Sequence, residues 1–236
     1  MGMHKADVVG YSPEPVQVRG WKEKEATGLR AKFSVRSWLK RLFRRKNIRI
    51  GVYGPPNAGK TTLANRIVMD WAGEVMGSVS DVPHETRKTK VKKNISIKHG
   101  KKSLSLDIVD TPGVATKIDF HEFVDTYGMS EDESRIRARE ATEGVIEAIK
   151  WLDEIDGILL AMDSSDDPFT QVNITILGNL EARKLPILIV ANKVDIPGTD
   201  AAVIKNAFPQ HPSVPVSALT GYNMERLYEA MVKHFR

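Results

Sequence analysis

The segment Gly54–Thr61, with the sequence GPPNAGKT, constrains the fold more than any other part of the chain. It matches the phosphate-loop pattern G-x-x-x-x-G-K-[ST] at every fixed position. A short run rich in β-branched residues at 48–52 precedes it, and residues 62–69 have the apolar spacing of a helix. Strand, glycine-rich loop and helix are the structural context that this pattern requires. The sequence therefore predicts an α/β domain with a site for a phosphate group.

The residue types in this loop indicate how it would bind phosphate. Gly54 and Gly59 let the backbone fold tightly, so that N–H groups and the helix N-terminus face the negative charge. We expect Lys60 to reach the β- and γ-phosphates of a nucleotide, and the Thr61 hydroxyl to be a ligand of Mg²⁺. A glycine-rich loop can also be an ordinary strand-to-helix turn, but the Lys-Thr pair at the required offset argues against this alternative.

Composition limits the class of protein. The chain has 236 residues, enough for one domain with an extension, and contains no cysteine. This excludes disulfides, zinc–cysteine sites and thiol catalysis. No apolar run approaches the roughly 20 residues of a membrane span, and the first residues lack the apolar core of a signal peptide. We therefore expect a cytoplasmic protein.

Positive charge is concentrated before the phosphate loop. Residues 1–49 contain 13 Lys and Arg against 4 Asp and Glu, whereas the remaining residues contain 22 against 26. Within 33–45, five apolar side chains fall within an arc of about 140° on a helical wheel, and basic side chains occupy the rest. The apolar residues are Val35, Trp38, Leu39, Leu42 and Phe43, and the basic ones are Arg36, Lys40, Arg41, Arg44 and Arg45. We predict an N-terminal extension, residues 1–46, with a basic amphipathic helix at about 33–45.

The rest of the chain alternates between strand and helix patterns. Apolar alternation on both sides of a turn at 99–102 predicts a β-hairpin. Ser130 and Glu133 form a capping-box pattern, which opens a helix to about residue 153 with Val145, Ile149 and Leu152 facing inward.

Two continuous apolar runs, at 157–162 and 186–191, are typical of parallel strands buried on both faces. A helix is expected between them at about 170–184, and a last helix after a short strand near 214–216. These elements predict a three-layer α/β domain over residues 47–236, with a mostly parallel sheet.

Four further motifs follow the phosphate loop. Asp110–Gly113, with the sequence DTPG, ends a predicted strand, where open α/β sheets bind ligands. Asn192–Asp195 (NKVD) ends another, and Ser217–Leu219 (SAL) follows the last strand. The segment 84–87 (HETR) precedes the hairpin. Any one of these motifs is weak evidence, but five in this order are not.

In this order the five motifs resemble the G motifs of translation-factor-class GTPases. The sequence GPPNAGKTTLANRI, together with DTPG, most resembles the Era, TrmE and EngA group, and the resemblance covers residues 48–236. The resemblance implies a P-loop GTPase domain that binds GTP and GDP. It also implies a molecular switch that hydrolyses GTP to GDP and phosphate with Mg²⁺.

The resemblance also implies the guanine contacts. Asp195 should accept two hydrogen bonds from the guanine N1–H and exocyclic amine, a donor pair that adenine lacks. Asn192 orients that loop, Lys193 packs along the base, and the Ala218 N–H faces the guanine oxygen. The implied nucleotide-binding set is Asn57, Ala58, Gly59, Lys60, Thr61, Thr62, Asn192, Lys193, Asp195, Ser217, Ala218 and Leu219.

The same resemblance implies the catalytic and metal residues. Lys60, Thr86 and Gly113 would act on the γ-phosphate, with the Gly113 N–H as a donor. Mg²⁺ would be held by Thr61, by Thr86 and, through water, by Asp110. Loss of the γ-phosphate would then release the loops that carry Thr86 and Gly113.

Two positions concern the rate of hydrolysis. Val114 stands where Ras-like GTPases have a water-positioning Gln, which implies slow intrinsic turnover. Asn57 matches an asparagine that resembles the potassium ligand of some TrmE-like GTPases, although Asn also suits a tight loop. The RNA-binding KH domain of Era has no counterpart before Arg236, so its function is not carried over.

The biological output remains open among three classes. The first is an RNA- or ribosome-associated assembly factor, and the second is a GTPase at an anionic membrane surface, peripheral to the membrane. The third is a binding module that holds GTP as a structural ligand. A nucleotide-dependent dimer fits any of them. The helix at 33–45 likewise has three open roles: docking on its own domain, lying on a membrane, or binding RNA phosphates.

Overall fold

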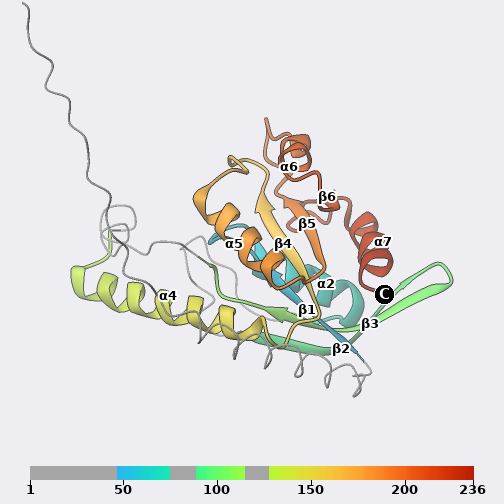
Figure 1. Cartoon of the computed structure of the whole chain (residues 1–236), viewed down its shortest axis with the longest axis horizontal. Helices are drawn as coiled ribbons and strands as arrows, with labels where there is room; N and C mark the ends of the chain where they lie inside the picture. The colour runs from blue at the N-terminus through green and yellow to red at the C-terminus, as the bar shows by residue number, and fades with distance from the viewer. Residues whose placement is uncertain (1–46, 75–88, 115–127) are drawn as a thin grey trace, which may run out of the picture. The chain divides into compact units, whose positions relative to one another are not determined.

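The computed structural model describes residues 47–74, 89–114 and 128–236. The predicted helix at 33–45 and the HETR motif at 84–87 lie outside these residues. A six-stranded sheet forms the centre of the described part, in the order β2-β3-β1-β4-β5-β6 (Figure 1). All neighbouring strands pair in parallel except β2 and β3, which form the antiparallel hairpin. The prediction of a mostly parallel sheet is therefore confirmed.

The elements follow the predicted alternation closely. The strands are β1 (Ile48–Tyr53), β2 (Lys90–His99), β3 (Lys102–Asp110), β4 (Gly157–Asp163), β5 (Ile187–Asn192) and β6 (Ser213–Pro215). The helices are α2 (Lys60–Ala72), α4 (Glu131–Trp151), α5 (Gln171–Ala182), α6 (Ala201–Ala207) and α7 (Met224–His234). Helix α6 was not predicted; it is a short helix that the Asp200 side chain caps by accepting from the Ala202 N–H. No helix among the described residues is long and apolar enough to cross a membrane.

Apolar side chains cover both faces of the sheet, which makes the domain three layers thick. On one face α2 and α7 pack against alternate residues of the strands, such as Ile50 and Val52 of β1. On the other face α4, α5 and α6 pack against the intervening residues, such as Tyr53 and Val109. β4 and β5 contribute to both cores, as expected of parallel strands buried on both sides.

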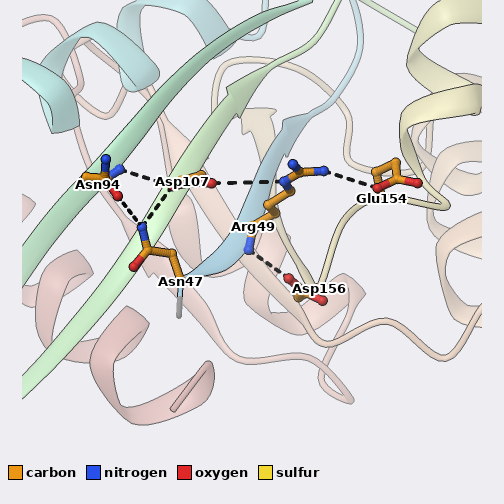
Figure 2. A network of polar contacts seen from close by, with 6 residues as sticks. All are labelled: Asn47, Arg49, Asn94, Asp107, Glu154 and Asp156. Carbon is orange, nitrogen blue, oxygen red and sulfur yellow. Dashed lines mark hydrogen bonds and ion pairs between the residues drawn. The ribbon is translucent and has the colours of Figure 1, made fainter. Parts of the chain in front are cut away.

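A polar network fixes the start of β1 (Figure 2). Asp107 of β3 accepts hydrogen bonds at Oδ1 from the Asn47 side chain, at 3.1 Å, and from the Asn94 N–H, at 3.0 Å. The Arg49 guanidinium lies between Asp107 and Glu154, with Nη1 donating to Glu154 Oε2 at 3.1 Å. The Arg49 N–H donates to Asp156 Oδ2 at 2.8 Å. These contacts tie β1 to β3 and to the turn that precedes β4.

Helix α4 differs from the expectation in its rotation. Ser130 caps it as predicted, with the reciprocal Glu133 contact. Leu152 is buried, but Ile149 is 46% exposed, so the prediction that Ile149 faces inward is wrong. The buried line instead follows small residues that include Gly144 and Ala148. The Tyr53 hydroxyl donates to the Ala148 carbonyl at 2.8 Å, and this contact holds that side of the helix against the core.

Candidate nucleotide-binding site

The phosphate loop, Gly54–Thr61, has a backbone that only glycine fits at two positions. Gly54 has a φ of +148°, and a Cβ there would lie 2.3 Å from the Ala161 carbonyl oxygen of β4. Gly59 has a φ of +82°, and its Cβ would lie 2.3 Å from Asn192 Nδ2. Gly59 is the N-cap of α2 and supplies no side-chain cap. No side chain at the cap position therefore competes with a ligand phosphate for the first N–H groups of α2.

Lys60 places a cation inside this loop. Its side chain is 6% exposed, and Nζ donates to the Pro55 carbonyl at 2.7 Å. Burial lowers the pKa of this ammonium group to about 8, and the nearby Asp110 carboxylate partly opposes that shift. A phosphate group bound at the loop would add counter-charge to this buried ammonium group and favour its charged form.

Asp110 and Thr61 meet beside Lys60 and fit a Mg²⁺ ion. The Thr61 hydroxyl donates to Asp110 Oδ2 at 2.9 Å. Asp110 is fully buried, and within the described residues its Oδ1 has no hydrogen-bond partner. Burial is the main cause that raises the pKa of this carboxyl group, and the Thr61 hydrogen bond and Lys60 oppose it. A hydrated cation would satisfy the spare oxygen and favour the ionised carboxylate.

The residues after Asp110 close over the phosphate loop. The Thr111 hydroxyl donates to the Val52 carbonyl at 2.7 Å, and the Val114 N–H donates to the Gly54 carbonyl at 3.2 Å. A Cβ at Gly113 would lie 3.1 Å from the Pro56 Cα and 3.3 Å from Lys60 Nζ. Gly113 thus lies directly against the loop that it is predicted to assist. Thr86 falls outside the described residues.

Asn192 joins the phosphate loop to the SAL loop, Ser217–Leu219. Its Nδ2 donates to the Ala58 carbonyl at 3.0 Å, and its Oδ1 accepts from the Ala218 N–H at 3.0 Å. The side chain is 2% exposed, so both hydrogen bonds are shielded from water. A single amide side chain thereby fixes the spacing between two motifs that lie far apart in the sequence.

The NKVD loop, Asn192–Asp195, has a fixed backbone and an exposed carboxylate. Lys193 has a φ of +64°, and its Nζ forms an ion pair with Asp163 Oδ2 at 2.6 Å. Hydrogen bonds from Lys193 and Ser165 hold the pKa of Asp163 below its usual value, against a burial effect that would raise it. The Val194 N–H donates to the Val216 carbonyl at 3.3 Å. Asp195 is exposed beyond this anchored turn.

Arg66 of α2 supports the SAL loop, a role that was not predicted from the sequence. Its Nε donates to the Ala218 carbonyl at 3.1 Å, and its Nη2 donates to the Leu219 carbonyl at 2.7 Å. Asp70, one helical turn on, lies 4.0 Å from Arg66 Nη1 and accepts from the Tyr228 hydroxyl at 2.5 Å. The only sequence signal for this role is an arginine next to an otherwise apolar helix face.

The remaining predicted residues lie at the edges of the site. Ser217 is fully buried, and its hydroxyl accepts from the Thr220 N–H at 3.1 Å, which shapes the SAL loop. Leu219 is 71% exposed, and Thr62 is half-buried in the first turn of α2. Asn57 is exposed with a φ of +59°, a conformation that Asn tolerates better than most residues. The carboxyl ends of β1, β3, β5 and β6 thus bring four of the five motifs together.

Comparison with known proteins identifies the class. A model of the family described as 50S ribosome-binding GTPase matches residues 49–193. GTPase Era of Geotalea daltonii is 29% identical over 187 residues, with 77% of this chain and 53% of that protein covered. GTPase Era of Clostridium acetobutylicum is 30% identical over 190 residues, with 78% and 54% covered. The tRNA modification GTPase MnmE of Nitrosomonas europaea is 28% identical over 188 residues, with 80% and 35% covered.

Solved structures show the same fold. Era of Aquifex aeolicus, bound to GDP and AlF4⁻, superposes with a TM-score of 0.62 at 23% identity, covering 81% of this chain and 58% of that one. Era in complex with MgGDPNP and a segment of 16S ribosomal RNA gives a TM-score of 0.60 at 23% identity, covering 82% and 58%.

Because the family model spans more than half of the chain, this chain belongs to the family of 50S ribosome-binding GTPases. The interpretation of its motifs as those of an Era-like GTPase is thereby confirmed, and so is the P-loop GTPase fold. The chain spans about half the length of the Era relatives that it matches.

Proposed function

We propose that this chain binds GTP, hydrolyses it to GDP and phosphate with Mg²⁺, and acts as a molecular switch. The observation that carries the proposal is the Asn192 bridge between the phosphate loop and the SAL loop. It sets one site in which a triphosphate at α2 and a guanine base at Asp195 and Ala218 can be bound together. The other described motif residues surround that bridge.

The chain's own groups supply positioning and charge. Phosphoryl transfer needs mainly alignment and neutralisation of phosphate charge. The Lys60 ammonium group, the N–H groups of the phosphate loop and the Gly113 N–H would supply these at the β- and γ-phosphates. Thr61 and Asp110 would hold Mg²⁺, which adds positive charge beside the transferred phosphate when it is bound. Val114 offers no side chain to orient water, so intrinsic turnover should be slow.

Nucleotide hydrolysis provides the first test. Purified protein should release phosphate from GTP with Mg²⁺, and ATP should neither be hydrolysed nor compete. Thr86→Ala should still bind GTP but lose the difference in partner binding between its GTP and GDP forms. If the GTP and GDP forms of the unmodified chain bind every partner equally, GTP is a structural ligand and the switch proposal fails.

RNA is the partner class that we propose for the switch. The family description refers to the ribosome, one neighbour of this fold is an Era bound to 16S ribosomal RNA, and the N-terminal extension is strongly basic. Pull-down of GTP-loaded and GDP-loaded full-length chain from lysate, followed by RNA and lipid analysis, tests this. Recovery of RNA chiefly with one nucleotide form supports the proposal. Recovery of anionic lipid without RNA would support the membrane alternative instead.

Potassium at Asn57 is a further part of the proposed mechanism. A monovalent cation beside the phosphates would place positive charge where other GTPases use an arginine finger. The hydrolysis rate should then be higher in potassium than in sodium at matched ionic strength, and Asn57→Ala should remove the difference. Equal rates for the unmodified chain would leave Asn57 with a purely conformational role. Light scattering in the same buffers would detect a nucleotide-dependent dimer.

A further inference from the structure

The β2–β3 hairpin carries a concentration of positive charge that the nucleotide site does not use. Residues 90–106 contain six of the 22 Lys and Arg that follow residue 49, but none of the 26 Asp and Glu. The lysines are Lys90, Lys92, Lys93, Lys98, Lys101 and Lys102. The surrounding domain is therefore acidic on balance, and this segment is its exception.

The outer half of the hairpin projects beyond the sheet (Figure 1). β1 pairs with β3 only from Leu106 onward, so residues 96–105 form a two-stranded ribbon without a third strand. Such a ribbon is marginal by itself, but one of its faces is packed in the domain core. The buried side chains are Ile95, Ile97, Leu104 and Leu106, which belong to the core formed with α2 and α7.

The opposite face of this ribbon is entirely polar. Because side chains alternate along a strand, residues between the buried positions point away from the core. Ser96 lies opposite Ser105, and Lys98 lies opposite Ser103, and all four are exposed. Lys101 and Lys102 extend the charge to the exposed tip. The result is a surface of hydroxyl and ammonium donors with no carboxylate on the ribbon.

The lysines at the tip are not neutralised by carboxylates of the described residues. Lys92 forms an ion pair with Glu74, near the base of the hairpin. For Lys93, Lys98, Lys101 and Lys102, the described part of the chain offers no such ion pair. Lysines on an edge strand also discourage unwanted strand pairing, but that role does not require lysines at the turn.

We propose that this outer face and tip of the hairpin (Ser96, Lys98, Lys101, Lys102, Ser103 and Ser105) bind the phosphate backbone of RNA. Lysine and serine donors contact phosphate oxygens, and the surface has no acceptor carboxylate that would oppose them. Residues 90–106 contain no Phe, Tyr or Trp, and His99 is the one side chain there that can stack on a base, so binding should depend little on base sequence.

The same chemistry argues against a membrane as the occupant of this surface. Charge alone attracts lysines to an anionic membrane, but firm binding at the interface also uses exposed apolar side chains that enter the lipid. All the leucine and isoleucine side chains of the ribbon are buried against α2 and α7. The choice of RNA among polyphosphates rests on the proposed function of the previous section.

The test compares two variants of the full-length chain that lose the same charge. The hairpin variant combines Lys98→Gln, Lys101→Gln and Lys102→Gln. The control variant combines Lys150→Gln, Lys184→Gln and Lys205→Gln, at three lysines that are exposed elsewhere on the domain. Affinity for a labelled 20-base-pair RNA duplex is measured by fluorescence anisotropy across a salt series. The hairpin variant should bind about tenfold more weakly, and its slope of log affinity against log salt should be smaller by about 2 to 3. The control variant should resemble the unmodified chain.

One further variant and further measurements distinguish failure of this inference from failure of the proposed function. Ser96→Asp adds one negative charge to the outer face and should weaken RNA binding with every lysine intact. GTP binding and thermal melting should stay unchanged in all variants, since the substituted side chains are exposed. If RNA affinity falls equally in the two triple variants, or in neither, the hairpin is not the RNA-binding surface, and RNA binds to another surface of the chain. No RNA binding by the unmodified chain would overturn both proposals. Binding only to phosphatidylserine vesicles, lost in the hairpin variant, would overturn the choice of RNA.

Discussion

The phosphate loop and the SAL loop lie in the same site but are held in different ways. The phosphate loop is shaped by its own backbone, because Gly54 and Gly59 adopt conformations and close approaches that a Cβ would prevent. The SAL loop is held by side chains from elsewhere: Asn192 accepts from its Ala218 N–H, and Arg66 donates to its Ala218 and Leu219 carbonyls.

This difference predicts how each loop responds to substitution. A loop fixed by its own residues fails when one of those residues changes, and distant substitutions affect it little, apart from those at Asn192, which contacts both loops. A loop held by side chains of other elements can be weakened by substitutions in any of those elements, while its own sequence stays unchanged. Four substitutions, three that act on these two loops and one in the neighbouring NKVD loop, test the site in order from the largest expected effect to the smallest.

Lys60→Ala should have the largest effect. It removes a buried cation from the phosphate loop, and GTP affinity should fall by at least about a hundredfold, because charge-assisted hydrogen bonds to phosphate are lost. Isothermal calorimetry measures this loss. Lys205→Ala, an exposed lysine of α6, serves as the control and should bind normally.

The lowered pKa of Lys60 adds a pH signature to the same experiment. In the ligand-free chain the ammonium group loses its proton as the pH rises through about 8, whereas bound phosphate favours the charged form. GTP affinity should therefore fall between pH 7 and pH 9, with proton uptake on binding. Lys60→Ala should lack this dependence. A flat profile for the unmodified chain would mean that Lys60 stays charged without ligand.

Asp195→Asn tests the guanine contact, with an expected loss of GTP affinity of about a hundredfold. Two charge-assisted hydrogen bonds to the base are replaced by one poorly matched amide. Xanthosine triphosphate should bind the variant better than GTP does, because its 2-oxo group offers an acceptor in place of the guanine amine. ATP binding by the unmodified chain in the same calorimetric series would contradict guanine recognition at this position.

Asn192→Ala tests the bridge between the two loops. It leaves the Ala58 carbonyl and the Ala218 N–H without their buried partner, at a cost of about 1–3 kcal/mol for each group. We expect about thirtyfold weaker GTP binding and a lower melting temperature, read by calorimetry and circular dichroism. Asn179→Ala, at an exposed asparagine of α5, is the matched control and should change neither. Normal GTP affinity in the Asn192 variant would show that the loops hold their spacing without the bridge.

Arg66→Ala should have the smallest effect. The carbonyls of Ala218 and Leu219 lose their donor but can be reached by water, so GDP release should accelerate by about fivefold. Arg66→Lys should also release GDP faster, since an ammonium group cannot replace the planar arrangement of donors. Stopped-flow release of a fluorescent GDP measures both rates. Arg226→Ala, at an exposed arginine of α7, should match the unmodified chain; equal acceleration there would remove the special role of Arg66.

The fold was predictable from the sequence because its elements carry strong local signals. Continuous apolar runs mark β4 and β5, which are buried on both faces, and the capping box marks the start of α4. The rotation of α4 was not predictable in the same way. One side of this helix carries large apolar residues such as Ile149, and another carries small residues such as Gly144 and Ala148. The hydrogen bond from Tyr53 to Ala148 favours burial of the side with small residues.

By itself, the sequence determined the positions of the motifs and the residues of the phosphate loop, because the conformation of this loop depends on glycines within the loop itself. Only the tertiary structure decided how this loop and the other loops are joined. The contacts of Asn192 with Ala58 and of Arg66 with the SAL loop join segments more than 100 residues apart. No local pattern records such a pairing, since the partners are backbone groups that every residue possesses. The positive charge of the hairpin can be read from the sequence. The exposed face of the hairpin, however, exists only because its isoleucine and leucine side chains pack on α2 and α7.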